Sequence, residues 1–459
     1  MSDSRTNTKE NTSREEIPAG TDALTAARAE IDDADGAARD AFACRMRAVG
    51  AVAAYKATAG LPVYDPAREK EMLARNVAHW QDPALIPHYT SLLRHTVALS
   101  REYQEGVLAR EAGICRIPIG EPAEGCDILF GRGLLARAGK WLPLRNGKTL
   151  ILTDDGVPAS YAESIRRAAG DGYLLTLPAG ESVKSFPRLE EVCRFLCDHG
   201  FDRGDALVTV GGGTVCDLGG FAAAVYMRGI RYYSVPTTLL AMADAGIGGK
   251  CAVDFSGIKN TLGVFYPARR VLIDPALTAT LPPRQFSSGM AEVIKVALTS
   301  DEALFCRIEN GLSVDENLDL ITEGAVRIKA NVVTQDPKEG NIRKVLNFGH
   351  TLGHAIESAG GLGNLLHGEC VALGMIPMTA PEIRGRLLHV LKKYGLPTDY
   401  ETRVGTAVPY LLHDKKRHGE FLDCVYVPAV GQSEIRRMKV PDVIRHLHRE
   451  AGLTPPAAL

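Results

Sequence analysis

Helical periodicity dominates the first quarter of the chain. As far as residue 59, and again in MLARNV and YTSLLRHTVALSREY, apolar residues recur at the three- and four-residue spacing of a helix that faces a core. A Gly-Leu-Pro break follows at residues 60–62, and Asp65 before Pro66 is typical of a helix N-terminus. The aspartate can accept a hydrogen bond from an N–H that lacks a partner, and proline has no such N–H to lose. The pattern predicts a wholly helical first domain.

The pattern of hydrophobic residues changes near residue 113. Short apolar runs now alternate with helical segments: CDILFG, TLILTDD, GYLLTLPAG, ALVTVGGG, YYSVPTT and RRVLID. This alternation predicts a mostly parallel sheet with helices on both faces, as in a Rossmann-like domain. After residue 282 helical patterns dominate, and only FLDCVYVPAVG resembles a late strand or hairpin. We expect a disordered polar tail (1–20), a helical domain (21–108), an α/β domain (113–282) and a mainly helical domain (283–459).

Composition narrows the class of protein. Of 459 residues, 45% are hydrophobic and 24% are charged, which excludes a collagenous or wholly disordered chain. The 53 basic and 55 acidic residues give a net charge of -2, so no long-range field attracts nucleic acid or an anionic membrane. Ten cysteines without CxxC pairs favour a reducing compartment, and neither a signal peptide nor a membrane span is visible. We expect a cytoplasmic enzyme.

The run ALVTVGGGTVCDLGGFAAA is the first candidate for chemistry. It reads as a strand, a glycine turn and a helix start, where backbone N–H groups can approach a pyrophosphate. The run is not the GxGxxG fingerprint, and a strand that reverses tightly needs glycines as well. On its own this signal leaves both interpretations open.

A series of motifs follows in order: YMRG, PTTLLAMADAGIGGK, IKNTLG, AEVIK, EGNIRKVLNFGHTLGH and LHGE. With this series, residues 113–440 resemble the 3-dehydroquinate synthase family, the sugar-phosphate cyclases of the shikimate pathway. The resemblance implies conversion of 3-deoxy-D-arabino-heptulosonate 7-phosphate to 3-dehydroquinate and phosphate. It implies transient oxidation by NAD, phosphate elimination, re-reduction and intramolecular aldol closure, so NAD is recycled.

One carboxylate and two imidazoles form a candidate metal site. Glu292, His350 and His367 suit a catalytic zinc that keeps one position open for substrate. Alternatively, His354 is the second imidazole ligand, because it lies four residues after His350 on one helical face. The resemblance assigns Glu292, His350 and His367 to one zinc or cobalt ion and leaves His354 for the substrate phosphate. Asn347 shares that surface if its segment is helical.

Cations recur through a chain that has almost no net charge. Burying Lys250, Lys295, Lys329 and Arg343 without anions would be prohibitive, so an anionic ligand is implied if they are buried. In the family, residues at Lys329 and Arg343 hold a carboxylate, and Arg228 resembles an arginine from a neighbouring subunit, which implies a homodimer. Completing the expected substrate site by resemblance are Lys250, Asn260, Asp244, Lys295, Glu339, Asn347 and His354.

A nicotinamide site is carried over from the same family. The acidic side chain of Glu181 can accept ribose hydroxyl hydrogen bonds and would repel a 2′-phosphate, which favours NAD over NADP. The residues assigned by the resemblance are Asp154, Glu181, Lys184, Gly212, Gly213, Asp217, Thr237, Thr238, Lys259, Thr280 and Leu281.

Charged residues also stand out in the helical first domain. Residues 21–105 resemble the all-helical chorismate mutase family, especially across RMRAVGAVAAYK and LPVYDPARE. Such a rearrangement needs oriented cations and donors, with no nucleophile. The alternative is a solvated face of i,i+4 pairs. In the resemblance Arg28 comes from the partner chain, and the implied site is Arg28, Arg45, Lys56, Asp65, Arg68, Glu69 and Gln104.

Three rival functions remain at this point. Another sugar-phosphate cyclase could make an aminated dehydroquinate or a deoxyinosose, although Arg343 and Asn347 argue against the inosose route. A metal-dependent alcohol dehydrogenase of similar fold would accumulate NADH. The helical domain could also bind a pathway product as a sensor without catalysis.

Overall fold

The computed structural model describes residues 21–59, 61, 63–120, 125–145, 147–256, 258–311, 314–360, 365–411, 417–418 and 420–454. The expected tail, residues 1–20, lies outside this described part. The chain divides into two compact units, Met1–Leu108 and Ala109–Leu459. Each unit is described by itself.

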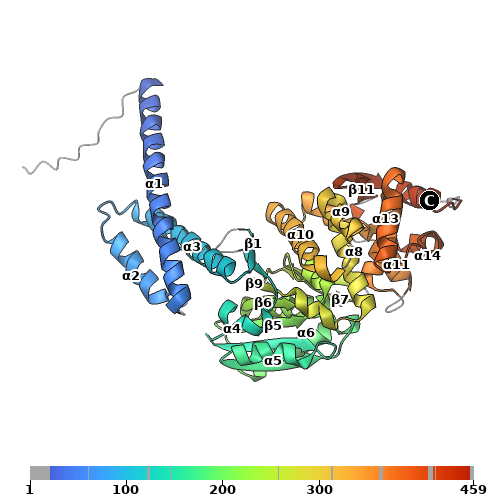
Figure 1. Ribbon diagram of the computed structural model, residues 1–459, viewed down its shortest axis with the longest axis horizontal. Coiled ribbons are helices and arrows are strands. Elements are labelled where there is room, and N and C mark those ends of the chain that lie inside the picture. The colour runs from blue at the N-terminus through green and yellow to red at the C-terminus, as the bar shows by residue number, and fades with distance from the viewer. Residues whose placement is uncertain are drawn as a thin grey trace, which may run out of the picture. The chain divides into compact units, whose positions relative to one another are not determined.

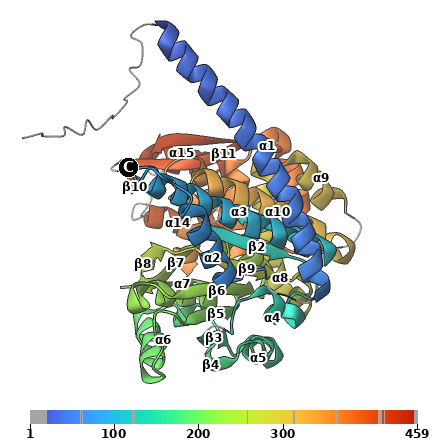
Figure 2. The same cartoon turned by 90° about the vertical axis from the view of Figure 1, so that its left-hand side faces the viewer.

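The first unit is helical, as the sequence predicts. It contains α1 (Thr21–Ala59), α2 (Pro66–Val77) and most of α3 (Ile86–Glu111), and α1 runs as one uninterrupted helix (Figure 2). The Asp65 carboxylate accepts a hydrogen bond from the Arg68 N–H at 3.0 Å, which confirms the expected N-cap of α2. Few apolar side chains of the unit are buried, whereas Leu24, Ile31 and Tyr55 of α1 are more than half exposed.

The second unit is built on a seven-stranded sheet, counted over the described residues, with the order β1-β2-β9-β6-β5-β3-β4. Every pair is parallel except β1–β2, which confirms the mostly parallel sheet. Strands β3 and β5 are almost entirely buried, because helices cover both faces and their runs are apolar. The strands are β1 (Cys115–Ile119), β2 (Cys126–Phe130), β3 (Lys148–Asp154), β4 (Asp171–Leu177), β5 (Ala206–Gly211), β6 (Arg231–Pro236) and β9 (Arg270–Ile273).

Helices and turns connect these strands (Figure 1). Helix α7 approaches β5 closely at Gly219, where a Cβ atom would lie 2.2 Å from the Thr209 methyl carbon. The connecting helices are α4 (Ala138–Trp141), α5 (Ala159–Ala168), α6 (Phe186–Asp198) and α7 (Gly213–Val225). The short turns are η1 (Leu135–Arg137), η2 (Glu181–Val183), η3 (Tyr226–Arg228), η4 (Ala241–Ala245) and η5 (Pro275–Thr280).

Four of the described strands were not predicted from the sequence. They are β1, the short β10 (Arg417–His418), and the hairpin of β7 (Lys250–Phe255) and β8 (Ile258–Phe265). The burial of β8 alternates between intermediate and exposed positions, so its sequence carries no continuous apolar run. The hairpin lies outside the main sheet and supplies residues to the site.

The last part of the second unit is mainly helical, as expected, and the predicted late hairpin is present as β11 and β12. In the described residues no helix is both long and apolar enough to cross a membrane. The helices are α8 (Pro283–Ser300), α9 (Glu302–Asn310), α10 (Val314–Gln335), α11 (His350–Gly360), α12 (His367–Met375), α13 (Pro381–Lys393), α14 (Glu401–Leu411) and α15 (Val440–Glu450). Also present are η6 (Ile342–Asn347), η7 (Ile376–Met378), β10 (Arg417–His418), β11 (Phe421–Ala429) and β12 (Gln432–Lys439).

Candidate active site

The carboxyl ends of the central strands carry the expected nucleotide residues. Asp154 ends β3, and Gly212 and Gly213 join β5 to the N-terminus of α7. The Thr237 N–H, just after β6, donates to the Gly211 carbonyl at 2.9 Å and holds the neighbouring turn beside this glycine turn. Ligands of open α/β sheets bind at this edge, where backbone N–H groups and the positive helix end favour a pyrophosphate.

The predicted metal ligands converge from three helices. The Glu292 Oε1 atom of α8 lies 3.6 Å from His367 Nε2 of α12 and 4.0 Å from His350 Nε2 of α11. This oxygen is buried and has no hydrogen-bond partner. Ring nitrogens of His350, His354 and His367 lie within 4.8 Å of one another, so His354 borders the same space.

Neighbouring groups orient the two imidazoles. The carbonyl oxygen of Phe348 lies 3.0 Å from His350 Nδ1, and the Glu357 carboxylate lies 3.6 Å from His367 Nδ1. Burial opposes a charge on His367, but Glu292 and Glu357 outweigh burial and raise its pKa to about 10. The cluster therefore favours a positive charge at this position, which a metal cation would supply.

Buried cations form the other wall of the site. Burial lowers the pKa of Lys329 to about 8, although Asp244 opposes the shift, and Lys295 and Arg343 lower it further. Lys329 donates to the Asp244 carboxylate, and Lys295 donates to Glu292. Arg343 is 1% exposed, and its guanidinium donates to the backbone carbonyls of Pro337 at 2.6 Å and Gly248 at 2.9 Å. The wall can bind an anion through groups that are already held in place.

The condition set for Asn347, one continuous helix with His350, is not met. Asn347 does not continue the face of His350, because η6 ends at Asn347 and Gly349, with φ 77°, precedes α11. The Asn347 amide instead donates to the Glu339 carboxylate at 2.7 Å, and the same carboxylate pairs with Lys250 at 2.6 Å. A turn, and not a helix face, brings Asn347 to the site.

The expected cofactor residues fall into two groups. In the first, Lys184 and Asp217 form a buried ion pair at 2.5 Å. In the second, Glu181 accepts a hydrogen bond from Thr214 at 3.0 Å and lies 3.7 Å from Lys259. The remaining contacts of this set are Thr238 with the Ala241 N–H, Thr280 with Tyr161, and the Leu281 N–H with the Thr278 carbonyl.

Sequence reasoning missed Glu357. Its carboxylate accepts a hydrogen bond from Lys259 at 2.9 Å and lies 3.6 Å from His367. Burial opposes its ionisation, but His367 and Lys259 hold its pKa well below the usual range. The signal was present, because Glu357 follows His350 by seven residues and His354 by three, on one helical face.

Two expected residues have exposed side chains, Arg228 at the end of η3 and Asn260 in β8. Arg228 has a φ of 64° and follows the exposed Met227, and Asn260 has a φ of 53°. Neither side chain is enclosed within the second unit, although the Asn260 backbone is tied to Asp254.

In the helical unit, three of the expected mutase-site residues each contact a neighbouring residue outside the expected set. Lys56 donates to the Val63 carbonyl at 2.7 Å, and Glu69 lies 3.4 Å from Arg101. The buried Gln104 donates to the Ser100 carbonyl, and its side-chain oxygen has no partner. The other expected residues are the partly exposed Arg45 and the exposed Arg28, Asp65 and Arg68.

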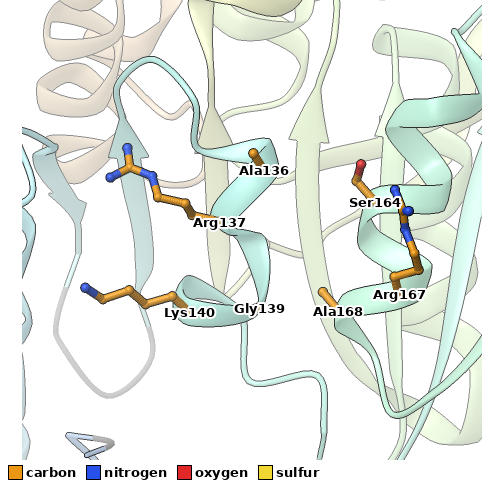
Figure 3. A pocket seen from close by; sticks show the side chains of 7 residues that line it. All are labelled: Ala136, Arg137, Gly139, Lys140, Ser164, Arg167 and Ala168. Atoms are coloured by element: carbon orange, nitrogen blue, oxygen red, sulfur yellow. The ribbon is translucent and has the colours of Figure 1, made fainter. Parts of the chain in front are cut away.

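A cavity of about 430 Å³ lies elsewhere in the second unit, between α4 and α5 (Figure 3). It adjoins the amino ends of β3 and β4, the edge of the sheet opposite to the glycine turn. Its cationic residues do not converge, because Arg137 and Lys140 extend away from Arg167 in Figure 3. This cavity is not the active site.

The fold and the site define a class: enzymes that join an α/β nucleotide-binding domain to a helical metal-binding domain. Within that class, the 3-dehydroquinate synthase N-terminal family matches residues 174–288 and the C-terminal family matches residues 289–417. The chain belongs to the 3-dehydroquinate synthase family. Residues 27–105 match the chorismate mutase type II family.

Named relatives agree with this assignment. The 3-dehydroquinate synthase of Streptococcus pneumoniae serotype 4 is 37% identical over 352 residues, which span 72% of this chain and 99% of the relative. A 2-deoxy-scyllo-inosose synthase complexed with carbaglucose-6-phosphate, NAD+ and Co2+ is 26% identical, with a TM-score of 0.64. The match covers 73% of this chain and 99% of the inosose synthase chain. The 2-epi-5-epi-valiolone synthase of Streptomyces hygroscopicus, with NAD+ and Zn2+ bound, is 28% identical, with a TM-score of 0.63, and covers 71% and 96%.

Proposed function

We propose that the second unit is a 3-dehydroquinate synthase. It converts 3-deoxy-D-arabino-heptulosonate 7-phosphate to 3-dehydroquinate and phosphate, with NAD and one divalent metal ion, zinc or cobalt. The observation that carries the proposal is the convergence of Glu292, His350 and His367 beside a wall of buried cations. The 37% identity over 99% of a synthase supports the same reaction.

The donor set fits a divalent cation. One buried Glu292 oxygen lacks a hydrogen-bond partner and faces the Nε2 atoms of both histidines. A carboxylate with two imidazoles is the ligand set of open catalytic zinc sites. A cation held by Glu292, His350 and His367 would supply the polarisation of a substrate hydroxyl, and NAD would supply a hydride acceptor and donor.

The chain's own cations bind and orient the substrate. Four cations, Lys250, Lys295, Lys329 and Arg343, share the site with three carboxylates, Asp244, Glu292 and Glu339. These groups leave one positive charge in excess, and a bound divalent ion would add two more. A substrate with one carboxylate and one phosphate would offset this positive charge. We assign Lys329 and Arg343 to the carboxylate. Lys250, Asn260, Asn347 and His354 are assigned to the phosphate, which they hold as it leaves.

We assign chorismate mutase activity, the conversion of chorismate to prephenate, to the first unit. The Lys56 ammonium is a donor that a dicarboxylate can engage, and the Gln104 side-chain oxygen, which has no hydrogen-bond partner, can accept from a substrate hydroxyl. Arg28 and Lys56 are 28 residues apart on one helix, which at 1.5 Å per residue separates them by about 42 Å. A single copy of the unit therefore cannot place both residues at one ligand.

A homodimer resolves this separation. Leu24 and Ile31, seven residues apart on one face of α1, are exposed apolar side chains that a second copy could cover, and the exposed Tyr55 lies further along the same helix. In the second unit, Arg228 lies on an exposed turn after Met227 and Val225, which are 46% and 44% exposed. We propose that Arg28 and Arg228 each complete a site in the partner subunit, and that the enzyme works in the cytoplasm, where its ten free thiols stay reduced.

One incubation tests the synthase. The purified chain with the heptulosonate phosphate, NAD and zinc should release phosphate and 3-dehydroquinate in equal amounts without accumulating NADH. NADH accumulation without phosphate would indicate an alcohol dehydrogenase. Phosphate with a different cyclic product would indicate another cyclase of the same class.

A second incubation tests the helical unit. With chorismate, the parent chain should form prephenate, and Lys56→Ala should lose this activity while retaining synthase activity. Saturable binding of chorismate without turnover would contradict a mutase and indicate a sensor.

A further inference from the structure

Glu357 occupies a position that none of the expected roles covers. It lies on α11 with His350 and His354, and its side chain is 12% exposed. Its two oxygens face different partners: Oε1 accepts from the Lys259 ammonium at 2.9 Å, and Oε2 lies 3.6 Å from His367 Nδ1. One carboxylate thus spans the metal side and the cofactor side of the site.

On the metal side, Glu357 fixes the orientation of His367. The ring presents Nε2 to Glu292 Oε1 at 3.6 Å and Nδ1 to Glu357 Oε2 at 3.6 Å. A histidine that binds a cation through Nε2 carries its proton on Nδ1, and a carboxylate at Nδ1 favours that tautomer. For His350 the Phe348 carbonyl oxygen lies beside Nδ1, at 3.0 Å.

On the cofactor side, Glu357 holds a residue of the α/β domain. Lys259 belongs to β8, outside the helical domain, and its ammonium also faces Glu181 at 3.7 Å. The other Glu181 oxygen accepts a hydrogen bond from Thr214, in the first turn of α7. A continuous chain of polar contacts therefore runs from His367 through Glu357 and Lys259 to Glu181, beside the glycine turn.

We propose that Glu357 is a positioning residue that couples metal binding to NAD binding. The inference rests on the proposed function, because Lys259 and Glu181 are assigned there to the cofactor. A cation on Nε2 polarises the Nδ1–H bond and strengthens its hydrogen bond to Glu357. The carboxylate is then held in place for Lys259, so metal raises the affinity for NAD. By linkage, NAD raises the affinity for metal by the same factor.

The test measures binding and needs no turnover. The affinity for Zn2+ is measured by chelator competition and that for NAD by titration, each with and without the other ligand. In the parent we expect a coupling factor of about fivefold or more. Glu357→Gln should weaken metal binding by about 10- to 100-fold and bring the coupling factor close to one. The absorption spectrum of bound Co2+ reports whether the ligand geometry is altered.

A matched control is available at Glu309, which pairs with Arg386 at 2.6 Å on the helical domain away from the site. Glu309→Gln removes a similar ion pair and should leave both affinities and the coupling factor unchanged. Thermal denaturation verifies that each variant is folded, and Glu357→Asp, which keeps the charge, should recover part of the metal affinity. Unchanged affinities and coupling in a folded Glu357→Gln protein would overturn the proposal. Failure of the parent to bind NAD and metal would instead count against the proposed function.

Discussion

Gly374 controls how closely the two histidine-bearing helices approach. A Cβ atom at Gly374 of α12 would lie 2.0 Å from the Gly349 carbonyl oxygen and 2.8 Å from the Gly353 N–H nitrogen. Real Cβ atoms essentially never come within 3.0 Å of another heavy atom, so α11 and α12 must separate by about 1 Å. Both obstructing atoms are backbone atoms, which cannot rotate away as a side chain can.

Two quantities should change in Gly374→Ala. Overpacking of this kind costs about 1–3 kcal/mol, and the backbone clash places the variant at the upper end, so the melting temperature should fall by about 4 °C. Metal–ligand distances tolerate shifts of only about 0.2 Å, so the separation of His350 from His367 should also weaken Zn2+ binding. Differential scanning calorimetry and chelator competition measure the two effects.

The control is Gly385→Ala in α13, where a new Cβ atom meets nothing within 4 Å. Alanine favours a helix over glycine by up to about 1 kcal/mol, so this variant should melt at the parent temperature or slightly above it. Its metal affinity should not change. A Gly374→Ala protein that melts with the parent and holds Zn2+ equally tightly would refute the role assigned to this helix contact.

Three other changes should each alter one measurable property. Burial opposes the ionisation of Asp336, but the N–H groups of Asn341, Gly340 and Arg343 lower its pKa below the ordinary value of 3.8. The ionised carboxylate therefore stabilises the fold when the pH is above 3.8. Asp336→Ala should therefore lower the melting temperature at neutral pH, and the difference should vanish as the pH falls below 3.8; a difference that persists would contradict this reasoning. Phe305→Ala removes a side chain that is 0% exposed and should cost about 3–5 kcal/mol in urea denaturation, whereas a cost below 1 kcal/mol would mean that the core refills the space. A chelator should lower the melting temperature of the parent but not of His350→Ala, and an equal decrease in both would place the metal elsewhere.

Local patterns determine how much of the fold could be predicted. Strands β3, β5 and β6 are buried on both faces and have continuous apolar runs, so the sequence predicts them and their parallel direction but not their order in the sheet. The hairpin of β7 and β8 was missed because many of its side chains are exposed, so neither strand has a continuous apolar run. The IKNTLG segment of β8 was interpreted only as a motif of the site. Strand β1 was missed because it is a short strand at the edge of the sheet, paired antiparallel with β2, and its sequence has no continuous apolar run.

Site residues were predictable where a motif names them, but not where the fold alone joins them. Glu292 and His350 are 58 positions apart, and no spacing rule brings their helices together; the packing of α8, α11 and α12 does so. The place of Asn347 depended on a single backbone conformation, the positive φ of Gly349, which ends one helical segment and starts another. Glu357 has two partners in different domains, and only the folded chain brings Lys259 and His367 to the same carboxylate. The Glu357 carboxylate contacts one residue assigned to the metal and one assigned to the cofactor, so the proposed coupling between the two sites depends on tertiary structure. A search for the metal motif alone, or for the cofactor motif alone, would not find it.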